Sequence, residues 1–434
     1  MVNLLQHASE RIVLAALRRI VRGRLRVSWP GGQEVFGGGN GHDADLTIHD
    51  RAFFARVATG GEIGLGDAYM DGLWSTTDLV VLVRLMLANR HTVANLPKVA
   101  TALSRGLEHL AHRARDNSWR GSRRNIHEHY DLGNRFFELF LDPNLLYSGA
   151  IYDQPGDSLA AAQVNKLRTI CDRLELGPAD HVLEIGTGWG GFALFAATRY
   201  GCRVTTTTIS TEQHAYATAR IARSRDAKQL IEVRRDDYRD LTGRYNKIVS
   251  IEMFEAVGLR HYDKFFGTCQ RLLTDDGAML MQTITVDDWR FADYMATPSW
   301  IAKRIFPGAE LASVAEILAS QARVTTLALH HAMEIGPHYA RTLQQWRERF
   351  HARLEDVRAQ GFDERFIRMW DLYLGFCEAA FEERHCGDVQ LMFTKPACRI
   401  RATRPASPGE SHGLPPEPEG VSGGYAPATT FERK

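Results

Sequence analysis

The sequence predicts an α/β fold with a doubly wound parallel sheet, because strand patterns alternate with helix patterns through its middle. Five apolar or β-branched runs are strand candidates: residues 181–185, 203–209, 230–234, 247–251 and 278–285. The first of them leads into a glycine-rich turn and then a helix at 192–198. Sheets of this kind bind ligands at the carboxyl ends of their strands, so we expect a site there.

The glycine-rich turn has the sequence V-L-E-I-G-T-G-W-G-G over residues 182–191. Four glycines are expected to take positive φ angles and to let a ligand approach the backbone: Gly186, Gly188, Gly190 and Gly191. A dinucleotide site has its acidic residue about 20 residues after the turn, whereas Glu184 precedes the first glycine here. The spacing E-x-G-x-G is typical of S-adenosylmethionine-dependent methyltransferases. A tight turn without a ligand is the alternative.

The composition limits the classes of partner. The length of 434 residues allows two or three domains, and the net charge of +1 gives no reason to expect a nucleic-acid partner. The six cysteines form no CxxC pair, which indicates reduced thiols rather than disulfides or metal ligands. No apolar run reaches the roughly 18 residues of a membrane span, and no signal peptide is recognisable. We expect a cytoplasmic protein that touches a membrane only at its surface.

The mixed helix and strand patterns of residues 1–96 predict a small, non-catalytic α+β domain. Residues 4–22 form an amphipathic, basic helix pattern, which either packs on its own domain or lies on an anionic bilayer. Strand patterns follow at 25–29 and 45–48.

Three further segments are predicted after it. Residues 97–126 form a basic helical linker, which could hold the protein at an anionic leaflet or could simply be solvated. Residues 127–403 form the second, larger domain. Residues 404–434 are rich in Pro, Gly, Ser and Glu and are expected to be disordered.

Polar residues follow the predicted strands. Ser210 is placed to cap the helix after the second strand, which leaves Gln213 able to reach a ribose. Asp236 and Asp237 follow the third strand, where an adenine amino group could lie. Aromatic residues between 289 and 376 either line a channel for a long apolar substrate or form ordinary helix core.

Several motifs, in this order, resemble the cyclopropane-fatty-acyl-phospholipid synthases. They are H-Y-D-L-G-N at 129–134, Tyr147-Ser148, the turn at 182–191, T-I-S at 208–210 with Glu212-Gln213, D-Y-R-D at 237–240, M-F-E-A-V-G at 253–258 and I-F-P-G at 305–308. Residues 64–72 resemble the small domain of bacterial members, and the resemblance covers roughly residues 45–400.

The resemblance implies a Rossmann-like class I methyltransferase fold with helical insertions for lipid. It implies transfer of the S-adenosylmethionine methyl group onto the cis double bond of an unsaturated phospholipid acyl chain. A bound bicarbonate then removes a proton and the ring closes. Such an enzyme would work at the inner face of the membrane, as a peripheral protein and possible homodimer.

The resemblance also assigns residues. Cofactor contacts are implied at Tyr130, Ser148, Gly186, Gly188, Gln213 and Asp237, and we add their neighbours Glu184, Thr208, Ser210 and Asp236. The catalytic bicarbonate pocket would consist of Glu255, Tyr339, Gln282, Gly149 and the backbone of Ile284. Glu255 would orient the base, unless it is only a carboxylate at a helix start.

Two positions depart from the pattern of the best-known members. Gly149 stands where they have Cys, and Gln282 stands where they have His. Gln282 can donate a hydrogen bond but cannot titrate near neutral pH. A methylene-branched or methyl-branched chain is therefore the alternative product. Two other hypotheses are a lipid-binding protein with an inactive domain and a methyltransferase of small molecules.

Overall fold

The computed structural model describes residues 2–93, 132–297 and 299–400. Tyr130, the predicted linker at 97–126 and the predicted tail at 404–434 lie outside these residues.

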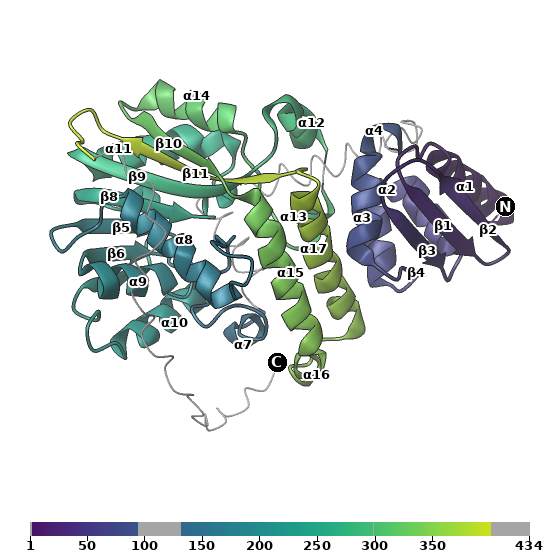
Figure 1. Ribbon diagram of the computed structural model, residues 1–434, viewed down its shortest axis with the longest axis horizontal. Helices are drawn as coiled ribbons and strands as arrows, with labels where there is room; N and C mark the ends of the chain where they lie inside the picture. Colours follow the sequence, from purple (N-terminus) through teal and green to yellow (C-terminus); the bar gives the residue numbers. More distant parts are fainter. Residues whose placement is uncertain (1, 94–131, 298, 401–434) are drawn as a thin grey trace. The chain divides into compact units, whose positions relative to one another are not determined.

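The N-terminal residues form a small four-stranded sheet with helices (Figure 1). Its order is β2-β1-β3-β4, and β1 pairs antiparallel with β2 and parallel with β3. The bounds are α1 Val2–Leu17, β1 Arg24–Trp29, β2 Gly32–Gly37, β3 Asp43–Ile48, α2 Ala52–Met70, β4 Trp74–Ser75, α3 Leu79–Ala88 and α4 Arg90–Val93. Both predicted strands are present, but β2 was not predicted. Gly31 allows the tight connection from β1 to β2 because it has a φ of 102°.

The second sheet has seven strands in the order β10-β11-β9-β8-β5-β6-β7. Their bounds are β5 His181–Ile185, β6 Arg203–Thr207, β7 Ile231–Arg234, β8 Tyr245–Ile251, β9 Leu273–Thr285, β10 Ala328–Glu334 and β11 Gly387–Thr394. The five predicted strands form the parallel part, which confirms the predicted α/β class. The unpredicted strands β10 and β11 add an antiparallel edge. Because β5 pairs with β6 on one side and β8 on the other, the strand order reverses at β5.

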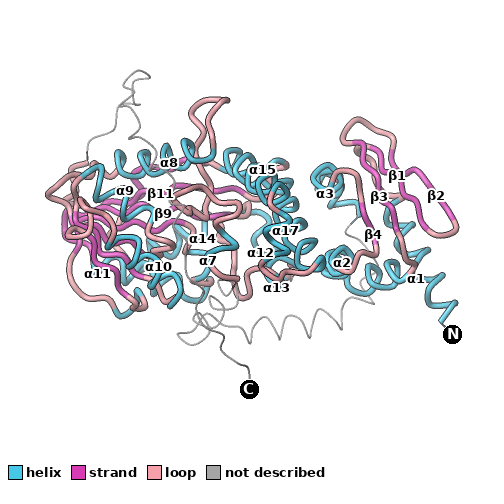
Figure 2. Tube along the Cα trace, turned by 90° about the horizontal axis from the view of Figure 1, so that it is seen from below, coloured by secondary structure: helices cyan, strands magenta, loops and turns pink. Residues whose placement is uncertain are grey.

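Helices cover both faces of this sheet, and Figure 2 shows the strands between α8 and α11. The helices are α8 Leu159–Arg173, α9 Gly191–Tyr200, α10 Thr211–Ala222, α11 Tyr262–Leu272 and α14 Val314–Val324, with short 3-10 turns η1 Tyr238–Asp240, η2 Phe254–Ala256, η3 Leu259–His261 and η4 Asp288–Arg290. The backbone N–H of Gln213 donates to Oγ of Ser210 at 3.2 Å, which confirms the predicted cap of α10.

Six further helices complete the described part of the chain. They are α7 Asn134–Phe137, α12 Phe291–Ala296, α13 Trp300–Arg304, α15 Gly336–Ala352, α16 Leu354–Ala359 and α17 Glu364–Glu382. Aromatic side chains of α7, α15 and α17 pack together. The helices α15 and α17 lie side by side (Figure 1). Phe136 is fully buried, with its ring centroid 4.8 Å from that of Trp370. Among the helices of the described ranges, none combines the length and the apolar character that crossing a membrane requires.

Candidate functional site

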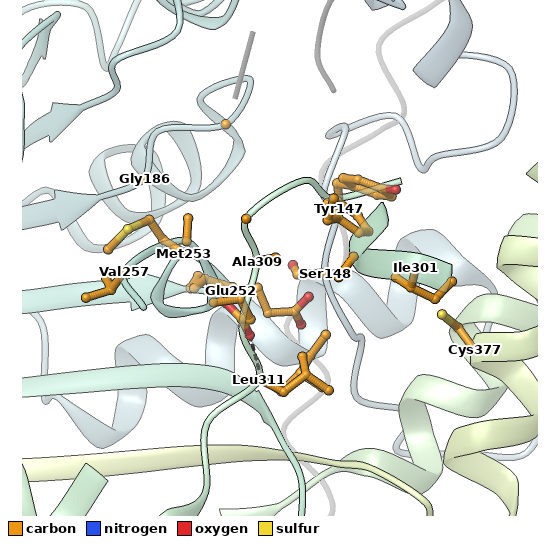
Figure 3. A pocket seen from close by; sticks show the side chains of 18 of the residues that line it. Tyr147, Ser148, Gly186, Glu252, Met253, Val257, Ile301, Ala309, Leu311 and Cys377 are labelled. Atoms are coloured by element: carbon orange, nitrogen blue, oxygen red, sulfur yellow. Dashed lines mark hydrogen bonds between the residues drawn. The ribbon is translucent and has the colours of Figure 1, made fainter. Parts of the chain in front are cut away.

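A cavity of about 570 Å³ opens at the carboxyl ends of the central strands. Figure 3 shows Gly186 and Met253 on one side of it and Ile301 and Cys377 on the other. The predicted site residues in its wall are Ser148, Glu184, Gly186, Gly188, Thr208, Gln213, Asp236, Asp237, Glu255, Ile284 and Tyr339. Three predicted site residues do not line the cavity themselves: Gly149, Ser210 and Gln282. Each is hydrogen-bonded to a residue that does line it.

The glycine-rich turn forms a backbone cradle between β5 and α9. Gly186 has a φ of 107°, and a Cβ atom there would lie 3.1 Å from Cβ of Met253. Gly188 and Gly190 also have positive φ, at 51° and 82°. The expectation for Gly191 was wrong, because this residue begins α9 without a positive φ. A Cβ there would meet the carbonyl oxygen of Asn144 at 2.8 Å, so close packing explains that glycine.

Glu184 lies at the base of the cradle as a buried carboxyl group. Its Oε2 accepts a hydrogen bond from Oγ1 of Thr206 at 2.5 Å. Burial raises the pKa of Glu184 to about 8. A cation or hydrogen-bond donor beside this carboxyl group would favour its charged form, so the position suits a ligand that carries such groups.

Two further predicted contacts are held by local hydrogen bonds. Oε1 of Gln213 accepts from Oγ1 of Thr208 at 3.0 Å, so the amide nitrogen of Gln213 is left to donate elsewhere. Asp237 is 3% exposed, and its two oxygens accept from Nε and Nη2 of Arg239 at 2.8 and 2.6 Å. An adenine amino group would therefore share Asp237 with this guanidinium group.

The pocket predicted for bicarbonate contains a side chain that the sequence did not assign to it, Glu252. The backbone N–H of Gly149 donates to Oε1 of Glu252 at 2.7 Å, and Nε2 of Gln282 donates to the same oxygen at 2.8 Å. The hydroxyl of Tyr339 donates to Oε2 at 2.7 Å. The carboxylate of Glu252 thus takes three of the donors that were predicted to hold the anion.

Glu255 accepts a hydrogen bond from the remaining predicted donor, the backbone N–H of Ile284. Its Oε1 accepts from the backbone N–H of Ile284 at 2.6 Å and from Oγ1 of Thr283 at 2.9 Å. Glu255 does lie in the first turn of η2, as the alternative expected, and these contacts also attach η2 to β9. Because two protein carboxylates use all of these donors, the residues of this pocket do not fit a bound bicarbonate.

The two departures from the family pattern match this arrangement. A Cβ atom at Gly149 would lie 2.8 Å from Oδ2 of Asp388 and 2.9 Å from the ring of Tyr339. Gln282 is fully buried, and its Oε1 accepts from Nε2 of Gln390 at 3.1 Å. That bond turns the amide nitrogen of Gln282 toward the carboxyl groups, where it also donates to Oδ2 of Asp388 at 2.9 Å.

Two half-buried carboxyl groups, Glu252 and Glu255, set the charge of this region together with a buried carboxyl group, Asp388, and a buried ammonium group, Lys166. Burial and Glu252 raise the pKa of Glu255 to about 7, and burial with both glutamates raises the pKa of Asp388 far more. Burial lowers the pKa of Lys166 to about 8, against the opposing effect of Glu252. Nζ of Lys166 donates to Oγ of Ser148 at 2.5 Å. These shifts favour the neutral form of Asp388, and the charge of Lys166 favours a carboxylate at Glu252.

Sequence reasoning missed Glu252, Asp388 and Lys166. Glu252 could have been noticed, because it directly follows the predicted strand at 247–251 and strand ends carry ligand sites. Asp388 lies on a strand that was not predicted, and Lys166 lies in a helix with no motif of its own.

Known proteins resemble this chain over most of its length. The mycolic acid cyclopropane synthetase family matches residues 117–391. Tuberculostearic acid methyltransferase UfaA1 of Mycobacterium tuberculosis is 37% identical over 344 residues, which are 77% of this chain and 80% of that protein. Cyclopropane-fatty-acyl-phospholipid synthase of Escherichia coli K12 is 36% identical over 362 residues, 81% of this chain and 88% of that protein.

A solved structure agrees with these sequences. Mycolic acid cyclopropane synthase CmaA1, complexed with SAH and CTAB, matches with a TM-score of 0.59 and 29% identity, over 63% of this chain and 98% of that one. The glycine cradle and the buried Glu184 fit the S-adenosyl ligand class of these enzymes. The chain therefore belongs to the mycolic acid cyclopropane synthetase family, as an S-adenosylmethionine-dependent methyltransferase of the cyclopropane-fatty-acyl-phospholipid synthase type.

Proposed function

We propose that this enzyme transfers the methyl group of S-adenosylmethionine onto the cis double bond of an unsaturated acyl chain in a phospholipid. The observation that carries the proposal is the composition of one cavity. The glycine cradle forms one part of its wall, and apolar side chains form another: Ile301, Phe306, Leu343, Phe376 and Phe381. Such a wall suits an acyl chain, and the cradle suits the methyl donor.

The chemistry explains why an enclosed, apolar site is needed. S-adenosylmethionine supplies a sulfonium methyl group, and the alkene is a poor nucleophile that must be held in line with it. Orientation of this kind lowers a barrier by roughly 7–11 kcal/mol. Aromatic faces such as Tyr147 and Phe306 at the wall can each stabilise a cation by about 0.5–2 kcal/mol. Exclusion of water protects the carbocation that follows methyl transfer.

A cyclopropane ring is the first product that we propose. It forms when the transferred methyl group loses a proton and its carbon bonds to the cationic carbon. A methylene-branched chain is the second candidate. It is supported by Gln282 in place of histidine, by Glu252 in the pocket, and by the likeness to an enzyme named tuberculostearic acid methyltransferase. A saturated methyl branch would need a reductant as well. Bicarbonate is not part of the proposal, because the pocket residues do not fit it.

We further propose that the enzyme works as a peripheral protein on the inner face of the membrane, because its substrate lies in a bilayer. Sedimentation with anionic vesicles tests this association, and a protein that stays in the supernatant contradicts it. A homodimer remains a prediction, to be tested by light scattering.

The product test uses purified enzyme, S-adenosylmethionine and vesicles of a phospholipid with oleoyl chains. Mass spectrometry and proton NMR of the released fatty acids then identify the product. A gain of one CH₂ unit with high-field ring protons supports the cyclopropane, and the same gain with vinylidene protons supports the methylene branch. No gain in mass contradicts the proposed function and returns attention to a lipid-binding protein or to small-molecule methylation.

A further inference from the structure

We infer that the carboxylate of Glu252 is itself the base that removes the proton after methyl transfer, in the place of a bound bicarbonate. The inference rests on the proposed function for its chemistry. It rests on the structure for the position of Glu252.

The first argument is the match between the side chain and the anion pocket. Glu252 and bicarbonate both present two oxygens on one planar carbon. The backbone of Gly149 and the amide of Gln282 donate to Oε1 of Glu252, at 2.7 and 2.8 Å. Oε2 accepts a hydrogen bond from Tyr339 at 2.7 Å, and the Glu252 carboxylate also shares a hydrogen bond with Asp388. A carboxylate oxygen can accept more than one hydrogen bond. Oε2 is therefore the oxygen that can still take a proton.

The second argument is the backbone of Glu252. Its φ is 47°, in a region that residues with a side chain rarely adopt and that persists only when the surroundings impose it. It directly follows β8 at the switch point of the sheet. This conformation places Glu252 in the cavity wall, next to Met253 of the methyl-donor side (Figure 3).

The third argument is charge. Glu252 and Glu255 already line the pocket, and Asp388 lies directly behind Gly149. A further anion would face these groups, with Lys166 as the buried cation beside them. The same groups suit a base that belongs to the protein. The charge of Lys166 lowers the free-energy cost of ionising Glu252. Asp388 occupies the space that a side chain at position 149 would need.

The reaction balances without another reactant. The π electrons form a bond to the sulfonium methyl carbon, and the carbon–sulfur pair stays on sulfur. The proton of the new methyl group then moves to Oε2 of Glu252. The electron pair of that C–H bond closes the ring or, after a hydride shift, forms the methylene double bond. The proton leaves Glu252 for water when the product departs.

The first test asks whether Glu252 fills the anion site, and it needs no lipid substrate. Sodium bicarbonate is titrated calorimetrically, in CO₂-free buffer, into the wild type and into Glu252→Gly. Glycine is unstrained at this φ, so the variant should fold. Binding to the variant but not to the wild type supports the inference. Saturable binding to the wild type overturns it, and so does absence of binding to both proteins.

The second test measures methyl transfer to phospholipid vesicles. Glu252→Gln keeps the shape of the side chain but removes the base, so turnover should fall by about 100-fold or more, with unchanged S-adenosylmethionine affinity. Glu348→Gln, on the exposed side of α15, is the matched control. Bicarbonate should restore turnover at least about 10-fold in Glu252→Gly and leave the wild type unaffected. A Glu252→Gln enzyme within about twofold of wild type, or a wild type that needs bicarbonate, overturns the inference.

The two tests separate the two claims. If the wild type methylates no monounsaturated phospholipid, the proposed function fails, and the bicarbonate titration alone decides whether Glu252 holds the anion site. If the wild type methylates lipid and Glu252→Gln does so equally well, the proposed function stands and the inference about the base fails.

Discussion

Replacing Tyr339 by phenylalanine removes the hydrogen bond from its hydroxyl to Glu252 and keeps the aromatic ring. The lost bond is 2.7 Å long, and Tyr339 is only 5% exposed, so water does not easily replace the hydroxyl. A hydrogen bond to a charged group is worth about 1.5–3 kcal/mol, which corresponds to one to two pKa units at about 1.4 kcal/mol each. Losing a donor to the charged form raises the pKa of Glu252. Turnover on the acid side of the pH profile, below the wild-type pKa of Glu252, should then fall roughly 10- to 100-fold.

The assay is turnover against pH for the wild type and Tyr339→Phe, together with S-adenosylmethionine affinity. The rising, acidic part of the plot of turnover against pH should move to higher pH in Tyr339→Phe. The turnover of the variant should therefore recover and approach that of the wild type as the pH rises. The other titratable groups that face Glu252 are Glu255, Asp388 and Lys166, and the lowered pKa of Lys166, about 8, sets the upper limit of that recovery.

A matched control is Tyr200→Phe, which removes a 2.5 Å hydrogen bond from a tyrosine hydroxyl to Asp172 outside the cavity. Its pH profile should equal that of the wild type. If Tyr339→Phe also shows the wild-type profile and turnover, Tyr339 does not tune the base, and the reasoning about the pocket is refuted.

Three further changes test other parts of the structure. Gly149→Ala brings a Cβ atom within 2.8 Å of Asp388 and should lower the free energy of unfolding by about 1–3 kcal/mol, measured with urea. Gln213→Ala should weaken S-adenosylmethionine binding roughly 10-fold by calorimetry, and an unchanged affinity would remove Gln213 from the cofactor site. Burial and then Arg290 lower the pKa of His385 from 6.5 to about 3, so only the unfolded state gains a proton just below pH 6.5 and stability falls as the pH falls. Between pH 7 and pH 5 the loss should be about 2 kcal/mol, and His385→Gln should flatten this slope.

The parallel part of the sheet could be predicted because its signals are local. The apolar run at 181–185 became β5 with the same bounds, and the glycine turn directly follows it. The edge strand β10 could not be predicted, because its side chains are mostly exposed and its sequence, A-L-H-H-A-M-E, lacks a buried face. The partner strand β11 is buried but follows a long helix, where nothing in the sequence marks a return to the sheet.

The sequence by itself determined the α/β class, the methyl-donor cradle and the cap at Ser210, since each depends on residues near one another in the chain. Only the tertiary structure decided what fills the anion pocket. Positions 149, 252 and 339 come from three distant segments, and the hydrogen bonds between them exist only after the sheet and α15 have packed. Local patterns specify helices, strands and turns. The protonation and direction of a buried carboxylate depend instead on which donors and charges the fold brings around it.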